Sequence, residues 1–128
     1  MNENDVAKMI VDGAYHIHVE LGPGLLESVY EVVLAKRLEK RGCKVERQKP
    51  ISFAFGGNVF DEGFRADLLV NDLVIVELKS TEQMHPVHKK QLKTYLRLSG
   101  KRLGLLINFG TELFKDGVSR VVLGLPEV

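Results

Sequence analysis

The stretch DLVIVELKS, residues 72–80, places Glu77 and Lys79 at the end of an otherwise apolar run. Side chains alternate along a β-strand, so Glu77 and Lys79 share one face while Leu78 points to the other. The apolar first half predicts a central strand covered on both sides. A carboxylate in such a strand is unfavourable unless a cation, a metal ion or a raised pKa compensates it. Glu77 is therefore either an ion-pair partner of Lys79 or part of a functional site.

The segments around this strand form blocks of helical and strand pattern. Apolar residues at helical spacing predict helices over residues 6–21, 25–41 and 85–100. Short β-type runs predict strands at residues 43–48, 51–55, 64–70, 73–79, 102–109 and 118–125. The order α-α-β-β-β-β-α-β-β predicts an α/β fold in which a mixed β-sheet is flanked by helices.

Composition narrows the class of protein. A chain of 128 residues predicts one domain spanning residues 1–128. A net charge of +1 means that any contact with nucleic acid must be local rather than the result of a global basic field. The single cysteine, Cys43, excludes an intrachain disulfide, and no signal-peptide pattern is present, so we expect a cytoplasmic protein. No apolar run approaches the roughly 20 residues that cross a bilayer, which argues against a membrane protein.

A second acid precedes the charged strand. The strand candidate FRADLLV carries Asp67, and a hairpin that placed Asp67 opposite Glu77 would bring their Cβ atoms to about 5 Å. Two carboxylates at that distance can share a divalent cation. This register requires an odd-length connection or a bulge around residues 71–73, because a two-residue turn would pair Val70 with Leu73. Facing carboxylates repel one another without a cation, so their convergence would indicate a metal site.

These residues carry a family resemblance. The combination of Asp67, ELK at residues 77–79 and QLKTY at residues 91–95 resembles the PD-(D/E)xK nuclease superfamily, in its branch with a QxxxY motif. The segment GLLESVY, residues 24–30, resembles the signature of the GxxExxY protein family within that superfamily. The similarity spans nearly the whole chain, although Ala66 stands where the superfamily name has proline. The resemblance implies a restriction-endonuclease-like PD-(D/E)xK core.

The resemblance also implies a set of site residues. Asp67 and Glu77, with the backbone carbonyl of Leu78, would bind Mg²⁺ or Mn²⁺, ions that prefer oxygen ligands. Glu27 resembles the helical acid that supports the metal in this superfamily, either directly or through water. Lys79 would orient or help deprotonate the attacking water and offset charge in the phosphate transition state.

Two further residues follow on the next helix. Gln91 and Tyr95 are one turn apart and so share a helix face, from which they would position Lys79, the metal-bound water or the nucleic-acid backbone. Structural interpretations remain open for single residues: Glu27 near a helix start also favours the helix dipole, and Tyr95 also fits a packing role.

The resemblance therefore implies a metal-dependent nuclease that hydrolyses phosphodiester bonds, with DNA favoured over RNA. The alternative is a noncatalytic nucleic-acid-binding or accessory subunit that retains the nuclease fold. The presence of Asp67, Glu77 and Lys79 together favours the enzyme, since a noncatalytic domain has no chemical need for all three. Because the chain is nearly neutral, a homodimer or a protein partner could supply additional binding surface.

Overall fold

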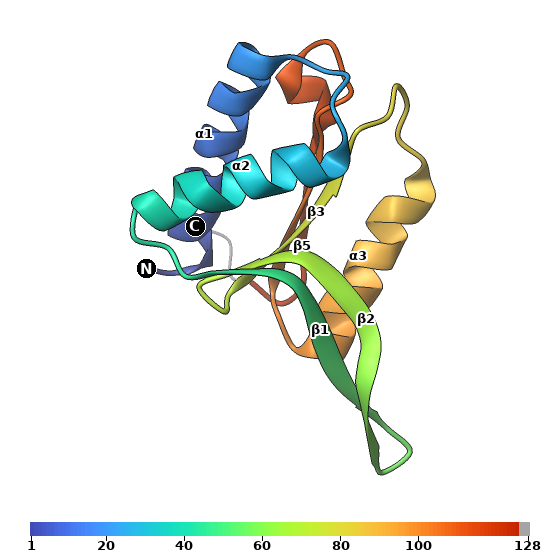
Figure 1. Ribbon diagram of the computed structural model, residues 1–128. Helices are drawn as coiled ribbons and strands as arrows, with labels where there is room; N and C mark the ends of the chain where they lie inside the picture. Colours follow the sequence, from blue (N-terminus) through green and yellow to red (C-terminus); the bar gives the residue numbers. More distant parts are fainter. Residues whose placement is uncertain (126–128) are drawn as a thin grey trace.

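The computed structural model describes residues 1–125, and these form a five-stranded sheet with helices on both faces (Figure 1). The elements are α1 (Glu3–Leu21), α2 (Glu27–Lys40), β1 (Val45–Phe55), β2 (Asn58–Val70), β3 (Val74–Lys79), α3 (Pro86–Ser99), β4 (Leu103–Asn108), the 3-10 helix η1 (Phe114–Gly117) and β5 (Val118–Val122). None of the helices in this part of the chain combines the length and apolar composition needed to span a membrane.

The sheet is mixed, as the sequence predicted. Its strands lie in the order β1-β2-β3-β4-β5, and only β3 and β4 are parallel to each other. Parallel neighbours need a crossover connection, and α3 supplies it. Helices α1 and α2 lie on one side of the sheet and α3 lies on the other (Figure 1).

The helix ends lie close to the predicted ones, although α1 begins at Glu3, three residues before the predicted start at residue 6. Asn2 and Asp5 form a reciprocal capping box at the start of α1. Helix α3 begins at Pro86 and ends at Ser99, and the φ of 73° of the following Gly100 is the left-handed cap expected of glycine there. Helix α2 begins at Glu27, two residues later than the helical pattern predicted.

The strands that precede β3 differ from the prediction in two ways, and one of them is that β2 begins at Asn58 rather than at residue 64. Residues 43–48 and 51–55 were expected to form two strands, but both lie in the single long strand β1. Gln48 adopts a left-handed φ of 49° without ending the pairing, because Arg47 still faces Leu68 and Lys49 still faces Ala66. Three strands rather than four therefore precede α3. The resulting β1–β2 hairpin extends beyond the rest of the sheet (Figure 1).

The connection between β2 and β3 has the length that the predicted register requires. Three residues, 71–73, link the strands, and Val70 pairs with Val74. Leu68 and Val76 form the last pair of this ladder, and the same register continued by one step would place Asp67 opposite Glu77. On its other side β3 pairs with β4 over all six of its residues.

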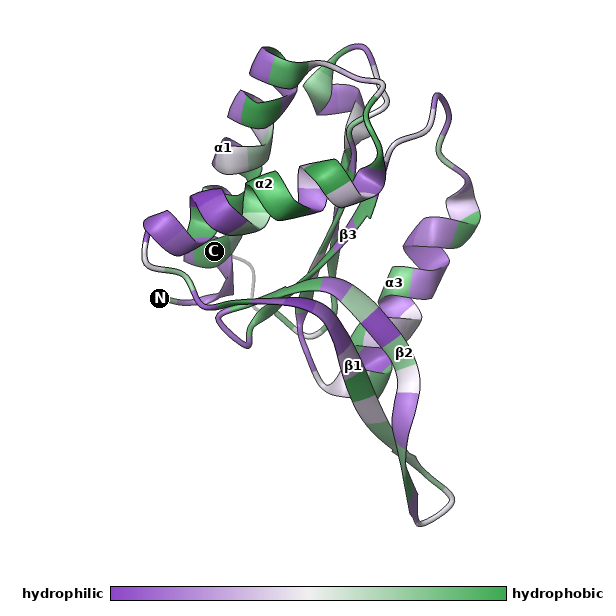
Figure 2. Ribbon diagram, in the orientation of Figure 1, coloured by the Kyte–Doolittle hydropathy of each residue, from purple (hydrophilic) through white to green (hydrophobic). Residues whose placement is uncertain are grey.

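Two apolar cores lie on the two faces of the sheet. Val74, Val76 and Leu78 contribute to the core under α1 and α2, whereas Ile75 packs under α3. This alternation agrees with the faces predicted for β3. Figure 2 shows hydrophobic colouring along β3 between the two helical layers. The charged end of β3 therefore emerges directly from a strand buried on both sides.

The charge of α3 differs from that of the rest of the protein. The helix contains four basic residues and no acid, which leaves 14 basic and 17 acidic residues for the remainder of the chain. Its basic residues are Lys89, Lys90, Lys93 and Arg97, all of them exposed. Three of them follow one another at intervals of four residues, so they form a stripe along one side of the helix.

Candidate active site

Asp67 and Glu77 meet where β2 separates from β3. The backbone N–H of Asp67 donates to Glu77 Oε2 at 2.9 Å, and the backbone N–H of Leu78 donates to Asp67 Oδ2 at 2.8 Å. These side-chain hydrogen bonds stand where the next backbone bonds of the β2–β3 ladder would be. The structure thus brings together the two acids that the sequence placed opposite each other.

An irregularity in both strands of the hairpin accompanies this arrangement. Phe64, Ala66 and Leu69 all pack in the core under α3, so the strict alternation of β2 is interrupted between residues 66 and 69. On β1 the residue facing Asp67 is Gln48, which has the left-handed backbone. The two irregular residues therefore lie side by side, and Asp67 is released from regular pairing at that point.

The environment of Glu77 disfavours its negative charge. Burial and the neighbouring negative charge of Asp67 raise the pKa of Glu77 to about 8, although the N–H of Asp67 and the positive charge of Lys79 act in the opposite direction. Without a cation, the carboxyl group of Glu77 therefore keeps its proton at neutral pH. A divalent cation placed between the two acids would remove the repulsion and favour the ionised form.

Lys79 is the last residue of β3 and lies on the same face as Glu77. Its backbone carbonyl accepts from the N–H of Phe109 at 2.8 Å, which fixes the end of the strand against the end of β4. Within residues 1–125 the ammonium group forms no ion pair with an acid. The interpretation of Glu77 and Lys79 as a simple ion pair is therefore not what the structure shows.

Tyr95 lies close to the acids and Gln91 lies one turn away. The ring of Tyr95 stacks on Phe64 of β2 with a centroid distance of 4.0 Å and an interplanar angle of 5°. Burial, and then the negative charges of Glu77 and Asp67, raise the pKa of Tyr95, so its hydroxyl group stays protonated. Gln91 is exposed on the same helix.

Glu27 lies at the edge of the site rather than in it. It is the exposed first residue of α2, and no hydrogen bond joins it to Asp67 or Glu77 in the described chain. Its negative charge affects the pKa of His88 of α3. Burial and the positive charge of Lys79 lower the pKa of His88, while the charge of Glu27 opposes that shift. Glu27, His88 and Lys79 therefore share one end of the site.

The acid of α2 that is connected to Asp67 is Glu31, which the sequence analysis did not select. Its side chain is nearly inaccessible, with 5% of the residue exposed. It accepts from Arg47 Nε at 3.1 Å and from Gln48 Nε2 at 2.6 Å, and Gln48 Nε2 also donates to Asp67 Oδ1 at 3.2 Å. A signal was present, because Glu31 precedes the buried Leu34 by three residues and so lies on the apolar face of its helix.

The loop before α2 is tied to the end of β3. Ser80 Oγ donates to the carbonyl oxygen of Leu25 at 2.6 Å, and the hydroxyl of Tyr30 accepts from the N–H of Leu25 at 3.2 Å. Tyr30 is fully buried and stacks on Phe109, so this residue of the GLLESVY motif is an anchor in the core. A cavity of about 450 Å³ lies between residues 23–26 and the segment after β3.

The donor set fits a hard divalent cation. Within residues 1–125 no three His, Cys, Asp or Glu side chains are arranged to hold a metal ion together. Mg²⁺, however, is commonly bound through one or two carboxylates and keeps several waters, so Asp67 and Glu77 are sufficient protein acids. The N–H of Leu78 donates to Asp67, and the N–H and C=O of one strand residue project from the same edge of the strand, so the Leu78 carbonyl lies on the edge of β3 that faces β2.

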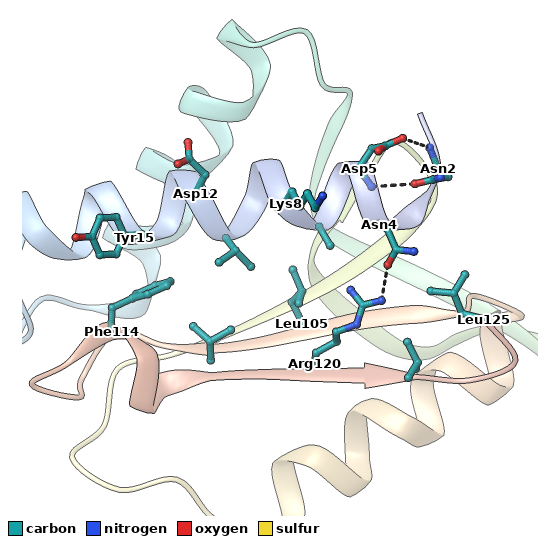
Figure 3. Close-up of a pocket in the computed structure, with 14 residues that line it drawn as sticks. Asn2, Asn4, Asp5, Lys8, Asp12, Tyr15, Leu105, Phe114, Arg120 and Leu125 are labelled. Atoms are coloured by element: carbon teal, nitrogen blue, oxygen red, sulfur yellow. Dashed lines mark hydrogen bonds between the residues drawn. The ribbon is translucent and has the colours of Figure 1, made fainter. Parts of the chain in front are cut away.

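A larger cavity lies elsewhere. It has a volume of about 1110 Å³ and is formed by α1, β5 and the segment around Phe114 (Figure 3). Its lining includes Tyr15, Leu105 and Arg120, and none of the site residues selected from the sequence. The larger cavity therefore does not coincide with the site formed by Asp67 and Glu77.

Comparison with known proteins gives one match. A family model described as the PD-(D/E)XK nuclease superfamily matches residues 4–121. The matched range contains α2, β1, β2, β3, α3 and β4 in full, and with them all the residues of the site. No curated protein and no solved structure matched the chain.

Proposed function

The chain belongs to the PD-(D/E)XK nuclease superfamily, and we propose that it is a metal-dependent nuclease that hydrolyses phosphodiester bonds, in DNA more readily than in RNA. Membership in the superfamily implies a nucleic-acid substrate. The observation that supports catalysis is the close approach of Asp67 and Glu77, because a cation bound between them would allow both groups to be ionised at neutral pH. The GLLESVY segment further supports assignment to the GxxExxY family.

PD-(D/E)XK nucleases generally use divalent metal ions. In this chain Asp67, Glu77 and the backbone carbonyl of Leu78 would hold Mg²⁺ or Mn²⁺. Such an ion supplies Lewis acidity and makes a bound water a stronger nucleophile at neutral pH. The protein contributes fixed oxygen positions, because the hydrogen bonds from both strand backbones restrict the two carboxylates before any ion arrives.

The remaining residues act on water and phosphate. Among the described residues no acid pairs with Lys79, so its ammonium group can orient the attacking water and offset negative charge that develops on the phosphate. The protonated hydroxyl of Tyr95 can donate a hydrogen bond toward the carboxylates or the substrate, and Gln91 can reach the backbone of the nucleic acid. Glu27, at the edge of the site, would support the metal through water.

An accessory role is the second candidate. The observation that favours it is the absence, in the described chain, of a third acid in contact with Asp67 and Glu77. A protein of this kind would bind metal and nucleic acid without turnover. A second copy of the chain or a protein partner would add binding surface in either case, because the net charge is only +1.

Cleavage of labelled single- and double-stranded DNA and RNA, with Mg²⁺ or Mn²⁺ at low salt, tests the proposal. We expect metal-dependent cleavage that falls by at least about 100-fold in Glu77→Ala and in Lys79→Ala. Glu46→Ala is the matched control, since Glu46 lies on β1 and pairs with Lys49 rather than with the site. Binding of metal and DNA by the wild-type chain without any cleavage would instead support the accessory role.

A further inference from the structure

We infer that Gln48 is a positioning residue of this site: anchored by Glu31, it holds Asp67 in the orientation that binds a divalent cation. The inference rests on the proposed function and assigns a role to residues that the family motifs do not include. It follows from three features of the described chain: the geometry of the amide, the burial of its anchor and the backbone conformation of Gln48.

The amide nitrogen of Gln48 bridges two carboxylates. It carries two hydrogens, and it lies 2.6 Å from Glu31 Oε1 and 3.2 Å from Asp67 Oδ1, so one hydrogen can serve each acid. A lysine or arginine in this place would neutralise Asp67 and weaken its attraction for a cation. A neutral amide fixes the direction of the carboxylate while leaving its charge in place, as hydrogen-bond partners of metal ligands commonly do.

Glu31 makes a fixed anchor for this amide. The residue is 5% exposed, its Oε2 accepts from Arg47 Nε at 3.1 Å, and the same oxygen forms an ion pair with Arg47 Nη2 at 3.0 Å. Arg47 thus compensates the charge of Glu31, and only Oε1 remains to receive Gln48. Because α2 holds Glu31 and β1 holds both Arg47 and Gln48, the network joins the helix to the hairpin at the level of Asp67.

The backbone of Gln48 supports a role for its side chain. A left-handed conformation is unfavourable for a residue with a Cβ atom, and glycine would avoid this cost. Gln48 nevertheless has a φ of 49° within a strand, directly facing Asp67. Unfavourable backbone conformations of this kind concentrate at functional sites, where the side chain is needed in that direction.

Gln48→Gly separates a structural role from a positioning role. Glycine removes the amide, which leaves Glu31 Oε1 without that donor, but it also relieves the backbone strain, so the two effects on stability oppose each other and the variant should unfold within a few degrees of the wild type. In a titration of Mn²⁺ alone, followed by calorimetry without nucleic acid, we expect its dissociation constant to rise by about 10- to 100-fold. A large loss of affinity with so small a change in unfolding temperature would not arise from a residue that only stabilises the fold.

Asp72→Gly is the matched control. Asp72 also has a left-handed backbone, with a φ of 56°, but it lies in the turn between β2 and β3 and contacts Lys101. Its replacement should likewise preserve the unfolding temperature and should leave the affinity for Mn²⁺ unchanged. Should Gln48→Gly fail to fold, Gln48→Met keeps the length of the side chain without its amide and should show the same loss of affinity.

The outcomes distinguish the two proposals. Wild-type binding of Mn²⁺ that persists unchanged in Gln48→Gly, or in Gln48→Met, would overturn the role of Gln48 while leaving the proposed nuclease intact. A wild-type chain that binds no Mn²⁺ would overturn the proposed function and this inference together. A loss of affinity equally large in Asp72→Gly would also overturn the inference, because the effect would then follow from the backbone change alone.

Discussion

The two edges of β3 are built differently. Toward β4, all six residues of β3 are paired in a parallel ladder, whereas toward β2 the pairing ends after three. The half of β3 that is paired on both edges contains only apolar residues, and the half that is open on one edge contains Glu77 and Lys79. Regular pairing therefore ends where charged side chains begin.

This difference shows how the fold makes room for charge. A strand that lost its partner inside the protein would leave buried N–H groups without acceptors. Here the carboxylate of Asp67 takes the N–H of Leu78, so one side chain both completes the hydrogen bonding of the strand and faces Glu77. Residues 74–76 of β3, paired on both edges, form a closed half that gives rigidity. Residues 77–79, paired only toward β4, form an open half in which Asp67 and Glu77 can approach one another.

The largest effect is expected in the closed half. Ile75 is fully buried under α3, so Ile75→Ala should lower the free energy of unfolding by about 2–5 kcal/mol through lost burial and a cavity. Urea unfolding measures this change. Val87→Ala, at an exposed position of α3, should shift it by less than about 0.5 kcal/mol. A loss below about 1 kcal/mol at Ile75 would contradict the packing described for this half.

A smaller effect is expected from removing the acceptor in the open half. Asp67→Ala leaves the N–H of Leu78 without its partner, which should cost about 1–3 kcal/mol. Hydrogen exchange of the Leu78 amide should accelerate while that of Ile75 stays slow. Asp67→Asn keeps an acceptor oxygen and serves as the control. Equal protection of Leu78 in all three proteins would show that the side chain does not replace the ladder.

The open half should also make stability depend on pH. An unfolded glutamate loses its proton near pH 4.5, whereas folded Glu77 keeps it up to about pH 8. Between these values the folded state binds more protons, so in metal-free buffer the free energy of unfolding should fall as pH rises, by at most about 1.4 kcal/mol per pH unit. Urea unfolding across pH 5–8 measures the slope.

Glu77→Gln provides the comparison for this pH dependence. The amide does not titrate, so most of the slope should disappear in the variant. Added Mg²⁺ should flatten the wild-type slope in the same way, because a bound cation favours the ionised carboxylate in the folded state. An identical slope in wild type and Glu77→Gln would assign the pH dependence to other groups.

The smallest effect is expected at the extreme end of β3. Ser80→Ala removes the hydrogen bond from Ser80 Oγ to the carbonyl of Leu25, a contact at an exposed position. We expect a loss of about 0.5 kcal/mol in urea unfolding, at the lower limit for a hydrogen bond. Ser52→Ala, at an exposed position of β1, should change nothing measurable. A loss of several kcal/mol at Ser80 would mean that the open end is as rigid as the closed half.

Much of this comparison could be predicted from the sequence. Helix caps, the alternation of β3 and the need for an odd-length connection after Val70 are local rules, and each agrees with the structure. These rules left the register conditional: an odd-length connection or a bulge would place Asp67 opposite Glu77, whereas a two-residue turn would not. The division of β1 into two strands was wrong because a left-handed Gln48 inside a strand contradicts the residue's preferences, and only the pairing with β2 maintains it.

The residues that contact Asp67 through Gln48 could not be predicted from local sequence patterns. Gln48 meets Glu31 across 17 positions of sequence, and the meeting depends on how α2 crosses the hairpin. Helical periodicity indicated that Glu31 faces the interior, but it could not name Arg47 as the compensating cation. Contacts of this kind follow from the arrangement of elements rather than from the pattern within any one of them.

Helix α3 contains basic residues and no acid, and this affects how the protein interacts with other charged molecules before contact. With four cations on one helix and an excess of acids elsewhere, a nearly neutral chain has a large separation of charge. Such a molecule turns in an electric field, and near a polyanion it presents α3 first. At low ionic strength it should be retained by a cation-exchange resin more strongly than its isoelectric point of about 7.9 suggests, and salt should release it.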